Sequence, residues 1–302
     1  MRNRKVIEEL GKYLFIFDEG YGTAYERYAL NRFISQLVKK YDILKVLELP
    51  ANGVMGIPGI KSLIFAELGC EVTVAHPSRV FLETAKGIWD VLGLDAHFIK
   101  SNWINSEFGD NTFDLVWNFC VFEHFYDPKR VIQEMVRVTR RYLFIEIQNI
   151  LNPGFPLHRF YHWVRREPWD HGSPSKMKLS SITTIINELN ATTVETGATD
   201  MPPWPDINIK VTEMASKKAS VPIWNDETEI TCDLRPAVKI KPLPSIINDI
   251  RKFEKCSGKE EIILQLFLLW YHLVESKAPH SIKKFLAHHP YVLAEKRSSK
   301  WR

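Results

Sequence analysis

Short apolar runs alternate with segments of helical periodicity along the first half of the chain. The apolar runs predict strands at residues 46–49, 71–75, 96–100, 113–118 and 141–148. Between them, apolar residues recur every three or four positions, which predicts helices at 57–68, 78–92 and 130–139. Because strands and helices alternate, we expect an α/β fold with a mostly parallel sheet and helices on both faces.

Other patterns flank this alternation. Residues 23–41 have helical periodicity, with Thr23 as the expected cap and Glu26 three residues later. Prolines interleave with aromatic residues over 150–176, which predicts an irregular cap, and a second proline-rich stretch at 202–244 predicts an extended insertion. The remaining predicted elements are helices at 180–189, 245–255 and 259–275 and strands at 192–197 and 291–295.

The stretch at residues 45–59 combines a buried strand with a turn. The strand ends near Glu48, and Pro50, Asn52 and Gly53 follow before the next helix begins. In open α/β sheets, ligands bind at the carboxyl ends of the strands, where such a loop lies. An ordinary connection between strand and helix is the alternative interpretation.

Composition excludes several classes of protein. The 302 residues are 45% hydrophobic and 25% charged, as in ordinary globular proteins. The net charge of +4 is uneven, because residues 277–302 hold seven Lys or Arg and one acid. We interpret this basic end as solvated, and without a basic patch interleaved with aromatics we do not expect nucleic-acid binding.

Cysteine spacing and hydropathy indicate in which cellular compartment we expect the protein. The cysteines at 70, 120, 232 and 256 are far apart in the sequence, which indicates neither a zinc site nor a disulfide framework and fits a reducing cytoplasm. The N-terminus lacks the apolar core of a signal peptide. The longest apolar run, 262–274, is too short to span a bilayer.

Four motifs together resemble the class I S-adenosylmethionine-dependent methyltransferases, in their small-molecule and lipid branch. They are V-L-E-L-P-A-N-G at 46–53, F-D-L-V-W-N-F-C-V-F-E-H-F-Y-D-P at 113–128, E-M-V-R-V-T-R-R-Y-L-F-I-E at 134–146 and the closing strand Y-V-L-A-E-K at 291–296. The resemblance implies a Rossmann-like sheet of seven strands, mostly parallel, whose final strand is antiparallel and inserted beside the fifth. It further implies in-line methyl transfer from S-adenosylmethionine to a small-molecule or lipid-like acceptor.

On this template, residues 1–302 form a single methyltransferase-like domain. Its expected parts are an N-terminal lid at 1–41, a cofactor-binding core at 42–149, an aromatic cap at 150–178, a proline-rich and helical insertion at 202–288 and the last strand at 291–296. The apolar run at 262–274 and the basic end also motivate a peripheral membrane contact.

The resemblance implies a set of cofactor-binding residues, of which several depart from the family pattern. The expected set is Glu48, Pro50, Asn52, Gly53, His76, Asn102, Trp103, Asn118, Phe119, Tyr21 and Tyr25. His76 stands where the family has an acid for the ribose hydroxyls, and we expect it to accept a ribose proton. Asn102 stands where the family often has Asp for the adenine amino group. The loss of each negative charge is expected to weaken binding about tenfold.

Three residues are candidates for proton transfer. His124 follows the fourth strand, and its ordinary pKa suits a general base. Asp170 can orient His171 as a base within E-P-W-D-H-G, or both can fix that turn. No metal is expected.

Two other classes of function are weighed against methyl transfer. A non-catalytic binding or scaffold protein with a degenerate methyltransferase fold is the main alternative, because His76 and Asn102 replace acids. A nicotinamide dehydrogenase requires a glycine fingerprint that Pro50 and Asn52 break. Methylation of DNA amino groups is disfavoured, because family members of that kind have two prolines after the fourth strand and this chain has Phe119 and Cys120.

Overall fold

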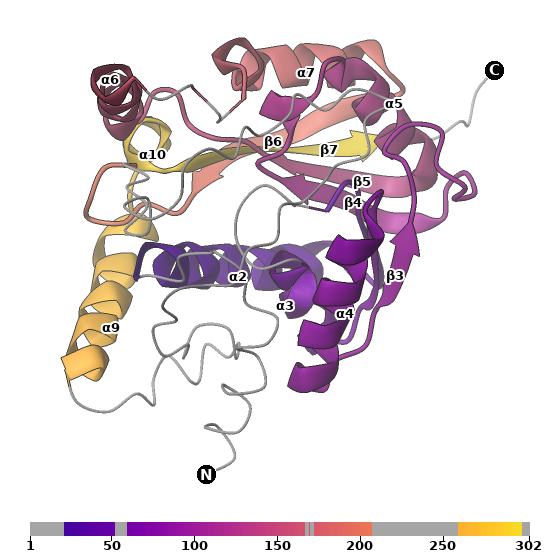
Figure 1. Cartoon of the computed structure of the whole chain (residues 1–302), viewed down its shortest axis with the longest axis horizontal. Helices are drawn as coiled ribbons and strands as arrows, with labels where there is room; N and C mark the ends of the chain where they lie inside the picture. Colours follow the sequence, from indigo (N-terminus) through magenta and orange to yellow (C-terminus); the bar gives the residue numbers. More distant parts are fainter. Residues whose placement is uncertain (1–20, 52–58, 167–168, 170–171, 207–258, 298–302) are drawn as a thin grey trace.

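The structure, a computed structural model, describes residues 21–51, 59–166, 169, 172–206 and 259–297. A seven-stranded sheet in the order β3-β2-β1-β4-β5-β7-β6 forms its centre (Figure 1). The strands are β1 (Lys45–Glu48), β2 (Glu71–His76), β3 (His97–Lys100), β4 (Phe113–Phe119), β5 (Thr139–Glu146), β6 (Ala191–Thr199) and β7 (His289–Lys296).

The sheet has the topology that the sequence predicts. Strands β1 to β5 pair in parallel, and β7 is antiparallel to both β5 and β6. The last strand in the chain therefore lies between the fifth and sixth, which confirms the predicted fold class. Every strand from β1 to β5 ends at the same edge of the sheet, and we call this the carboxyl edge.

Helices cover both faces of the sheet (Figure 1). On one face lie α2 (Tyr21–Tyr41), the short η1–α3 segment (Ile60–Glu67) and α4 (Arg79–Leu92). On the other face lie α5 (Pro128–Val138) and α7 (Leu179–Glu188). A hydrophobic core lies on each face of the sheet, and alternate residues of a strand pack into one core or the other. Trp117 belongs to the core on the first face and Val116 to the core on the second. This alternation is the period-two pattern of a strand buried on both sides.

Local sequence signals place the two helices nearest the carboxyl edge. The Ser78 side chain accepts a hydrogen bond from the Phe81 N–H and caps α4, which ends at Gly93 with φ 70°. Asp127 caps α5 by accepting from the Lys129 N–H, and Pro128 takes the first helical position. Helix α4 begins one residue after the start of the predicted helix at 78–92, and α5 begins two residues before that at 130–139.

One prediction about the chain after β5 needs correction, and the predicted helical insertion contains one more helix. The supposedly irregular stretch at 150–176 contains the helix α6 (Gly154–Arg165) and the short turn η3 (Pro174–Lys176). Pro153 and Pro156 are compatible with α6 because they lie at its cap and first turn, where backbone N–H groups have no helical partner. A further helix, α10 (His280–Leu286), precedes β7.

The helix predicted at 259–275 is confirmed as α9 (Lys259–Trp270), continued by the π-helical segment η4 (Tyr271–Glu275). The helix at 245–255 and most of the proline-rich stretch lie outside the described residues. Among the helices described, none is long and apolar enough to cross a membrane.

Candidate functional site

The first element of the candidate site is Glu48, the last residue of β1. Its side chain is buried, and Oε2 accepts a hydrogen bond of 2.6 Å from the Ser62 hydroxyl. The Trp117 indole N–H of β4 in turn donates to Ser62 Oγ at 3.1 Å. Glu48 is thus fixed at the start of the η1–α3 segment, directly beyond the loop of residues 52–58.

The backbone that leaves β1, just before residues 52–58, is also held in place. The Leu49 N–H donates to the Trp117 carbonyl, and the Ala51 N–H donates to the Ala75 carbonyl, each at 3.0 Å. Pro50 is buried between them. The predicted loop residues Asn52 and Gly53 lie outside the described residues.

His76 is buried at the end of β2 and has a defined tautomer. Its Nδ1 accepts a hydrogen bond of 3.0 Å from the Ser78 N–H, and its ring stacks on Phe81 at 4.0 Å. Burial lowers the pKa of His76 to about 3, so the ring is neutral and carries its proton on Nε2. The expectation that His76 accepts a ribose proton is therefore reversed, because Nε2 is a donor.

The residues after β3 face different surroundings. Asn102 is exposed, whereas Trp103 is buried with its ring 5.4 Å from that of Phe125. The Asn102 carbonyl accepts a hydrogen bond from the Ser101 hydroxyl. Asn102 therefore presents its amide to solvent beside the carboxyl edge, and Trp103 packs inward.

Asn118 and Phe119 end β4 and point to opposite faces of the sheet. The Asn118 amide donates to the Leu49 carbonyl at 3.2 Å, which ties β4 to the chain leaving β1. Phe119 lies under the Lys61 ammonium, 4.1 Å from its ring centroid, and against the His289 ring at 4.7 Å. Phe119 thus contacts both the η1–α3 segment, through Lys61, and the last strand, through His289.

The structure places His124 beside the loop that carries the other predicted base. His124 is buried in the turn η2 (Phe122–His124), and burial together with the Lys176 charge lowers its pKa to about 4. The neighbouring Glu123 carbonyl accepts a hydrogen bond of 2.8 Å from the Ser173 N–H. Asp170 and His171 lie outside the described residues, so their predicted roles stay predictions.

The two tyrosines predicted to cover the cofactor lie on α2. Tyr25 is buried, and its hydroxyl contacts the Glu275 carboxylate and the Met201 carbonyl. Its ring packs against Trp204 and Phe267. These contacts direct Tyr25 toward α9 and η4. The position of the Tyr21 side chain is not described.

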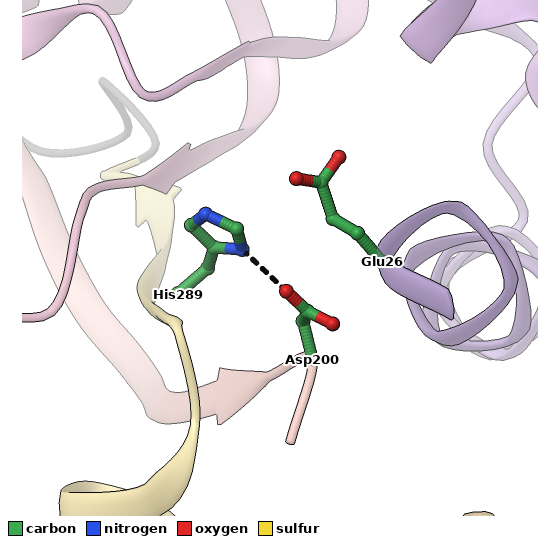
Figure 2. Close-up of side chains that lie close together, drawn as sticks. All are labelled: Glu26, Asp200 and His289. Atoms are coloured by element: carbon green, nitrogen blue, oxygen red, sulfur yellow. Dashed lines mark ion pairs between the residues drawn. The ribbon is translucent and has the colours of Figure 1, made fainter. Parts of the chain in front are cut away.

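A polar cluster that the sequence did not predict lies at the β6–β7 end of the carboxyl edge. Figure 2 shows Glu26 of α2 facing Asp200 and His289, and one ligating atom from each lies within 4.8 Å of the others. The Asp200 Oδ2 atom lies 3.3 Å from Nδ1 of His289. Lys61 forms an ion pair with Glu26 on the other side.

His288 completes the charge balance of this cluster. Its Nδ1 lies 3.3 Å from Asp200 Oδ2, and its Nε2 lies 3.2 Å from the Trp204 carbonyl. Both ring nitrogens face oxygen acceptors, which suits the protonated ring. Burial alone would lower the pKa of His288, but the Asp200 charge outweighs it and raises the pKa to about 9.

Glu146 lies beside the cluster at the end of β5. It is fully buried, and its Oε1 accepts a hydrogen bond of 2.6 Å from the Thr199 hydroxyl. Burial raises the pKa of Glu146 to about 8, so the carboxyl group is mostly protonated at neutral pH. Since β5 is parallel to β1 and β4, Glu146 reaches the same edge as Glu48 and Phe119.

The central part of this sheet matches a known protein family. Residues 55–145, from the loop after β1 through β5, match the family model described as a methyltransferase domain. These residues form a domain of the methyltransferase family. The methyl donor of this family is S-adenosylmethionine. No curated protein matches the chain.

Solved structures with similar folds have low sequence identity to the chain. Magnesium protoporphyrin IX methyltransferase from Synechocystis PCC 6803, with bound S-adenosylhomocysteine, is 14% identical; the match covers 67% of this chain and 92% of that one, with a TM-score of 0.48. The YcgJ protein from Bacillus subtilis is 13% identical, with 89% and 99% covered and a TM-score of 0.45. A SAM-dependent methyltransferase from Aquifex aeolicus is 16% identical, with 55% and 83% covered and a TM-score of 0.41.

The carboxyl edge of the methyltransferase domain has polar atoms that suit a polar ligand. Within the described residues, His76 Nε2 and Asn118 Oδ1 are buried without a hydrogen-bond partner. Buried polar atoms normally have partners, so an unpaired donor and acceptor at strand ends are compatible with a nucleoside that offers hydroxyl and amine groups. Glu48 supplies a fixed carboxylate between them.

Sequence reasoning missed Glu26, Asp200 and His289. Each lies outside the motifs of the methyltransferase domain, and they come from three distant parts of the chain. One signal was present: the adjacent pair His288-His289 directly precedes the last predicted strand. Its position at the start of a strand between β5 and β6 places it at the carboxyl edge.

Proposed function

We propose that the chain transfers a methyl group from S-adenosylmethionine to a small-molecule acceptor. The observation that carries this proposal is the fixed carboxylate of Glu48 at the end of the first strand of a methyltransferase-family sheet. His76 and Asn118 end the neighbouring strands with unpaired buried polar atoms. The family resemblance implies a cofactor-binding role for the same three positions.

The residues that end β1 and β2 and follow β3 at the carboxyl edge each have a proposed role in binding the cofactor. Glu48 orders the loop that receives the methionine part. His76 Nε2–H donates to a ribose hydroxyl oxygen, in place of the carboxylate that usually accepts from it. Asn102 hydrogen-bonds the adenine. The buried Trp103 ring next to it packs against Phe125 and holds this part of the chain in place. The net gain from each neutral contact is about 1 kcal/mol, less than a charged contact gives.

The polar cluster is the proposed acceptor side. Bound S-adenosylmethionine supplies an electrophilic methyl group together with its leaving group. The protein must then align the acceptor and remove its proton. We assign His289 as the general base: Nε2 takes the proton of an acceptor hydroxyl or amine as the methyl group leaves sulfur, and the Asp200 carboxylate, 3.3 Å from Nδ1, stabilises the resulting positive charge. Phe119 and protonated Glu146 flank this position.

Several finer predictions remain open within this proposal. His124, Asp170 and His171 stay candidates for proton transfer. A lipid-like acceptor stays an alternative to a polar one, although the titratable side chains at the edge favour an acceptor with a polar reacting group. A cytoplasmic setting and a role without metal also stay predictions.

Calorimetric titration with S-adenosylmethionine tests the cofactor assignment. We expect binding by the wild type and an affinity about tenfold lower in Glu48→Gln, because the amide loses the negative charge that orders the loop. The matched control is Glu71→Gln, at the amino end of β2, which should bind as the wild type does. Thermal melts verify that both variants are folded.

The alternative function predicts a different result. A scaffold protein with a degenerate methyltransferase fold gives no heat and no thermal shift up to millimolar ligand. This outcome would refute the enzymatic proposal and support the scaffold, because the replaced acids at His76 and Asn102 would then have abolished cofactor binding.

A further inference from the structure

Helix α6 has its polar and apolar faces reversed relative to an ordinary surface helix. Its buried face carries His158 and His162. Its outward face carries Leu157, Phe160 and Trp163, whose exposed fractions are 52%, 60% and 72%. A surface helix normally turns charged and polar residues outward. Exposed aromatics on adjacent turns indicate a face that contacts something apolar.

Arginines border this apolar face on both sides. With 100° between successive residues, the outward aromatic and aliphatic residues span one side of the helix, Arg165 lies at one margin and Arg159 at the other. Arg166 follows as the left-handed C-cap, with φ 54°. All three arginines are exposed. Helix α6 contains no acidic residue. Its outward surface is therefore apolar at the centre and cationic at the rim.

Helix α10 repeats this composition next to α6. Ile282, Phe285 and Leu286 are exposed by 44%, 51% and 42%, and the cations Lys283 and Lys284 stand between them. This helix also has no acidic residue. Both helices therefore present exposed apolar side chains with basic neighbours.

Hydrogen bonds join the start of α6 to the end of α10. The Asn152 amide donates to the Leu286 carbonyl at 2.8 Å, and the Asn149 amide donates to the Ala287 carbonyl at 2.7 Å. The two helices lie near one another at one end of the sheet (Figure 1). We call the exposed side chains of these two neighbouring helices, taken together, the α6–α10 face.

We propose that the α6–α10 face docks on an anionic phospholipid membrane. Interfacial helices bury Trp, Phe and Leu at the headgroup boundary and place Lys and Arg against anionic lipid. Long basic side chains at the rim extend toward the headgroups while their stems cover apolar surface. Both requirements are met by the residues of this face. The proposal does not depend on methyl transfer.

Two parts of the protein itself could in principle cover the α6–α10 face: residues 207–258 and a second copy of the chain. The charge of each argues against it. Residues 207–258 contain nine Lys or Arg and seven acids, a net charge of +2, so this segment does not complement a cationic face. A second copy would present the same positive rim, and the whole chain has a charge of +4. Like charges brought together in this way repel.

The test is co-sedimentation of the full chain with vesicles at low salt. One set is phosphatidylcholine alone, and the other contains about one third phosphatidylglycerol, which gives the surface a negative potential. We expect binding to the anionic vesicles only, and a loss of that binding as salt is raised. Binding to both sets alike, or to neither, would overturn the proposal.

Paired variants locate the contact. Phe160→Ser with Trp163→Ser should reduce the bound fraction about tenfold or more, and Arg159→Glu with Arg165→Glu should abolish it. The control is Leu266→Ser with Leu273→Ser, which removes a comparably exposed apolar pair from α9 and η4 (57% and 56%). The control should bind as the wild type does.

Two results would contradict the assignment to α6 and α10. In the first, the control variant loses vesicle binding as strongly as the Phe160 and Trp163 variant. In the second, light scattering shows that the wild type is a dimer and that the Phe160 and Trp163 variant is a monomer with unchanged vesicle binding, which would make this face a contact between copies. Circular dichroism verifies that each variant is folded.

Discussion

His289 Nδ1 lies 3.3 Å from Asp200 Oδ2 because two antiparallel strands bring them together. Thr199 at the end of β6 pairs with His289 at the start of β7, so the residue after Thr199 is held beside the imidazole. The His288 N–H also donates to the Asp200 carbonyl at 2.7 Å, which fixes the backbone at this point. The dyad is therefore a consequence of sheet register.

The first prediction distinguishes His289 from His124 as the base. His289→Gln should lower turnover at least about 100-fold, which is the usual contribution of a positioned general base. His124→Asn should leave turnover close to that of the wild type. The measurement is release of S-adenosylhomocysteine with an acceptor found by screening small phenols, acids and amines. Full activity in His289→Gln, or its loss only in His124→Asn, would reverse the assignment.

The second prediction concerns the missing carboxylate after β3. Asn102→Asp should tighten S-adenosylmethionine binding by up to about tenfold, because a charged acceptor for the adenine amino group replaces a neutral one. Asn102 is exposed, so the fold should tolerate the change. Calorimetry measures the effect, with Asn105→Asp as the nearby exposed control. Equal affinities in all three proteins would place the adenine elsewhere.

The third prediction is that unfolding free energy falls as pH rises from about 6.5 to about 9, because above the ordinary pKa of histidine the opposing contributions of His76 and His124, whose pKa values are lowered, have ended. Burial raises the pKa of Glu146 to about 8 and that of Glu123 to about 7. Above the unfolded pKa of a carboxyl group, such a folded state binds more protons than the unfolded state, so stability declines until the folded group ionises. His288, with its pKa raised to about 9, adds to the decline as it loses its proton.

Replacement of Glu146 tests this explanation. Glu146→Gln removes one ionising group, so its melting temperature should fall less between pH 6 and pH 9 than that of the wild type, by an amount equivalent to a few kcal/mol at most. Glu71→Gln, which changes an exposed carboxylate, should follow the wild type. Parallel curves for Glu146→Gln and the wild type would show that Glu146 does not ionise in this range.

The fourth prediction separates backbone strain from close packing at two glycines. Gly59 (φ 70°) and Gly69 (φ 85°) both have left-handed backbones. A Cβ at Gly59 would lie 3.0 Å from Ala85 Cβ, whereas none of the described atoms lies within 4 Å of a Cβ at Gly69. Gly69→Ala should cost about 1 kcal/mol, and Gly59→Ala should cost more. Denaturant unfolding measures both, and equal losses would contradict the packing argument.

The fifth prediction is that turnover survives removal of divalent metal. Glu26, Asp200 and His289 have the donor types of a metal site, but the Lys61 ammonium pairs with Glu26 and protonated His288 pairs with Asp200. These cations already balance the carboxylates. Dialysis against EDTA followed by elemental analysis and assay tests this. A stoichiometric metal, or activity that returns only with an added cation, would show that the cluster binds metal.

Much of the fold could be predicted from the sequence, because strand and helix periodicities are local. The apolar runs at 46–49, 71–75 and 113–118 each predicted a buried strand, and the periodic segments at 78–92 and 130–139 predicted the helices that Ser78 and Asp127 cap. The family resemblance then placed the strand starting near Tyr291 beside β5, which the structure confirms. Helix α6 was missed because its prolines masked its periodicity.

The sequence by itself thus determined the wound sheet and the residues that end its first strands at the carboxyl edge, since those residues follow their own strands within one contiguous segment. Tertiary structure alone decided the His76 tautomer, which depends on the fold of the next turn, and the meeting of Glu26, Asp200 and His289. Those three side chains come from elements far apart in the chain. Their proximity is set by the packing of α2 on the sheet and by the register of β6 against β7, and neither is encoded in a local pattern.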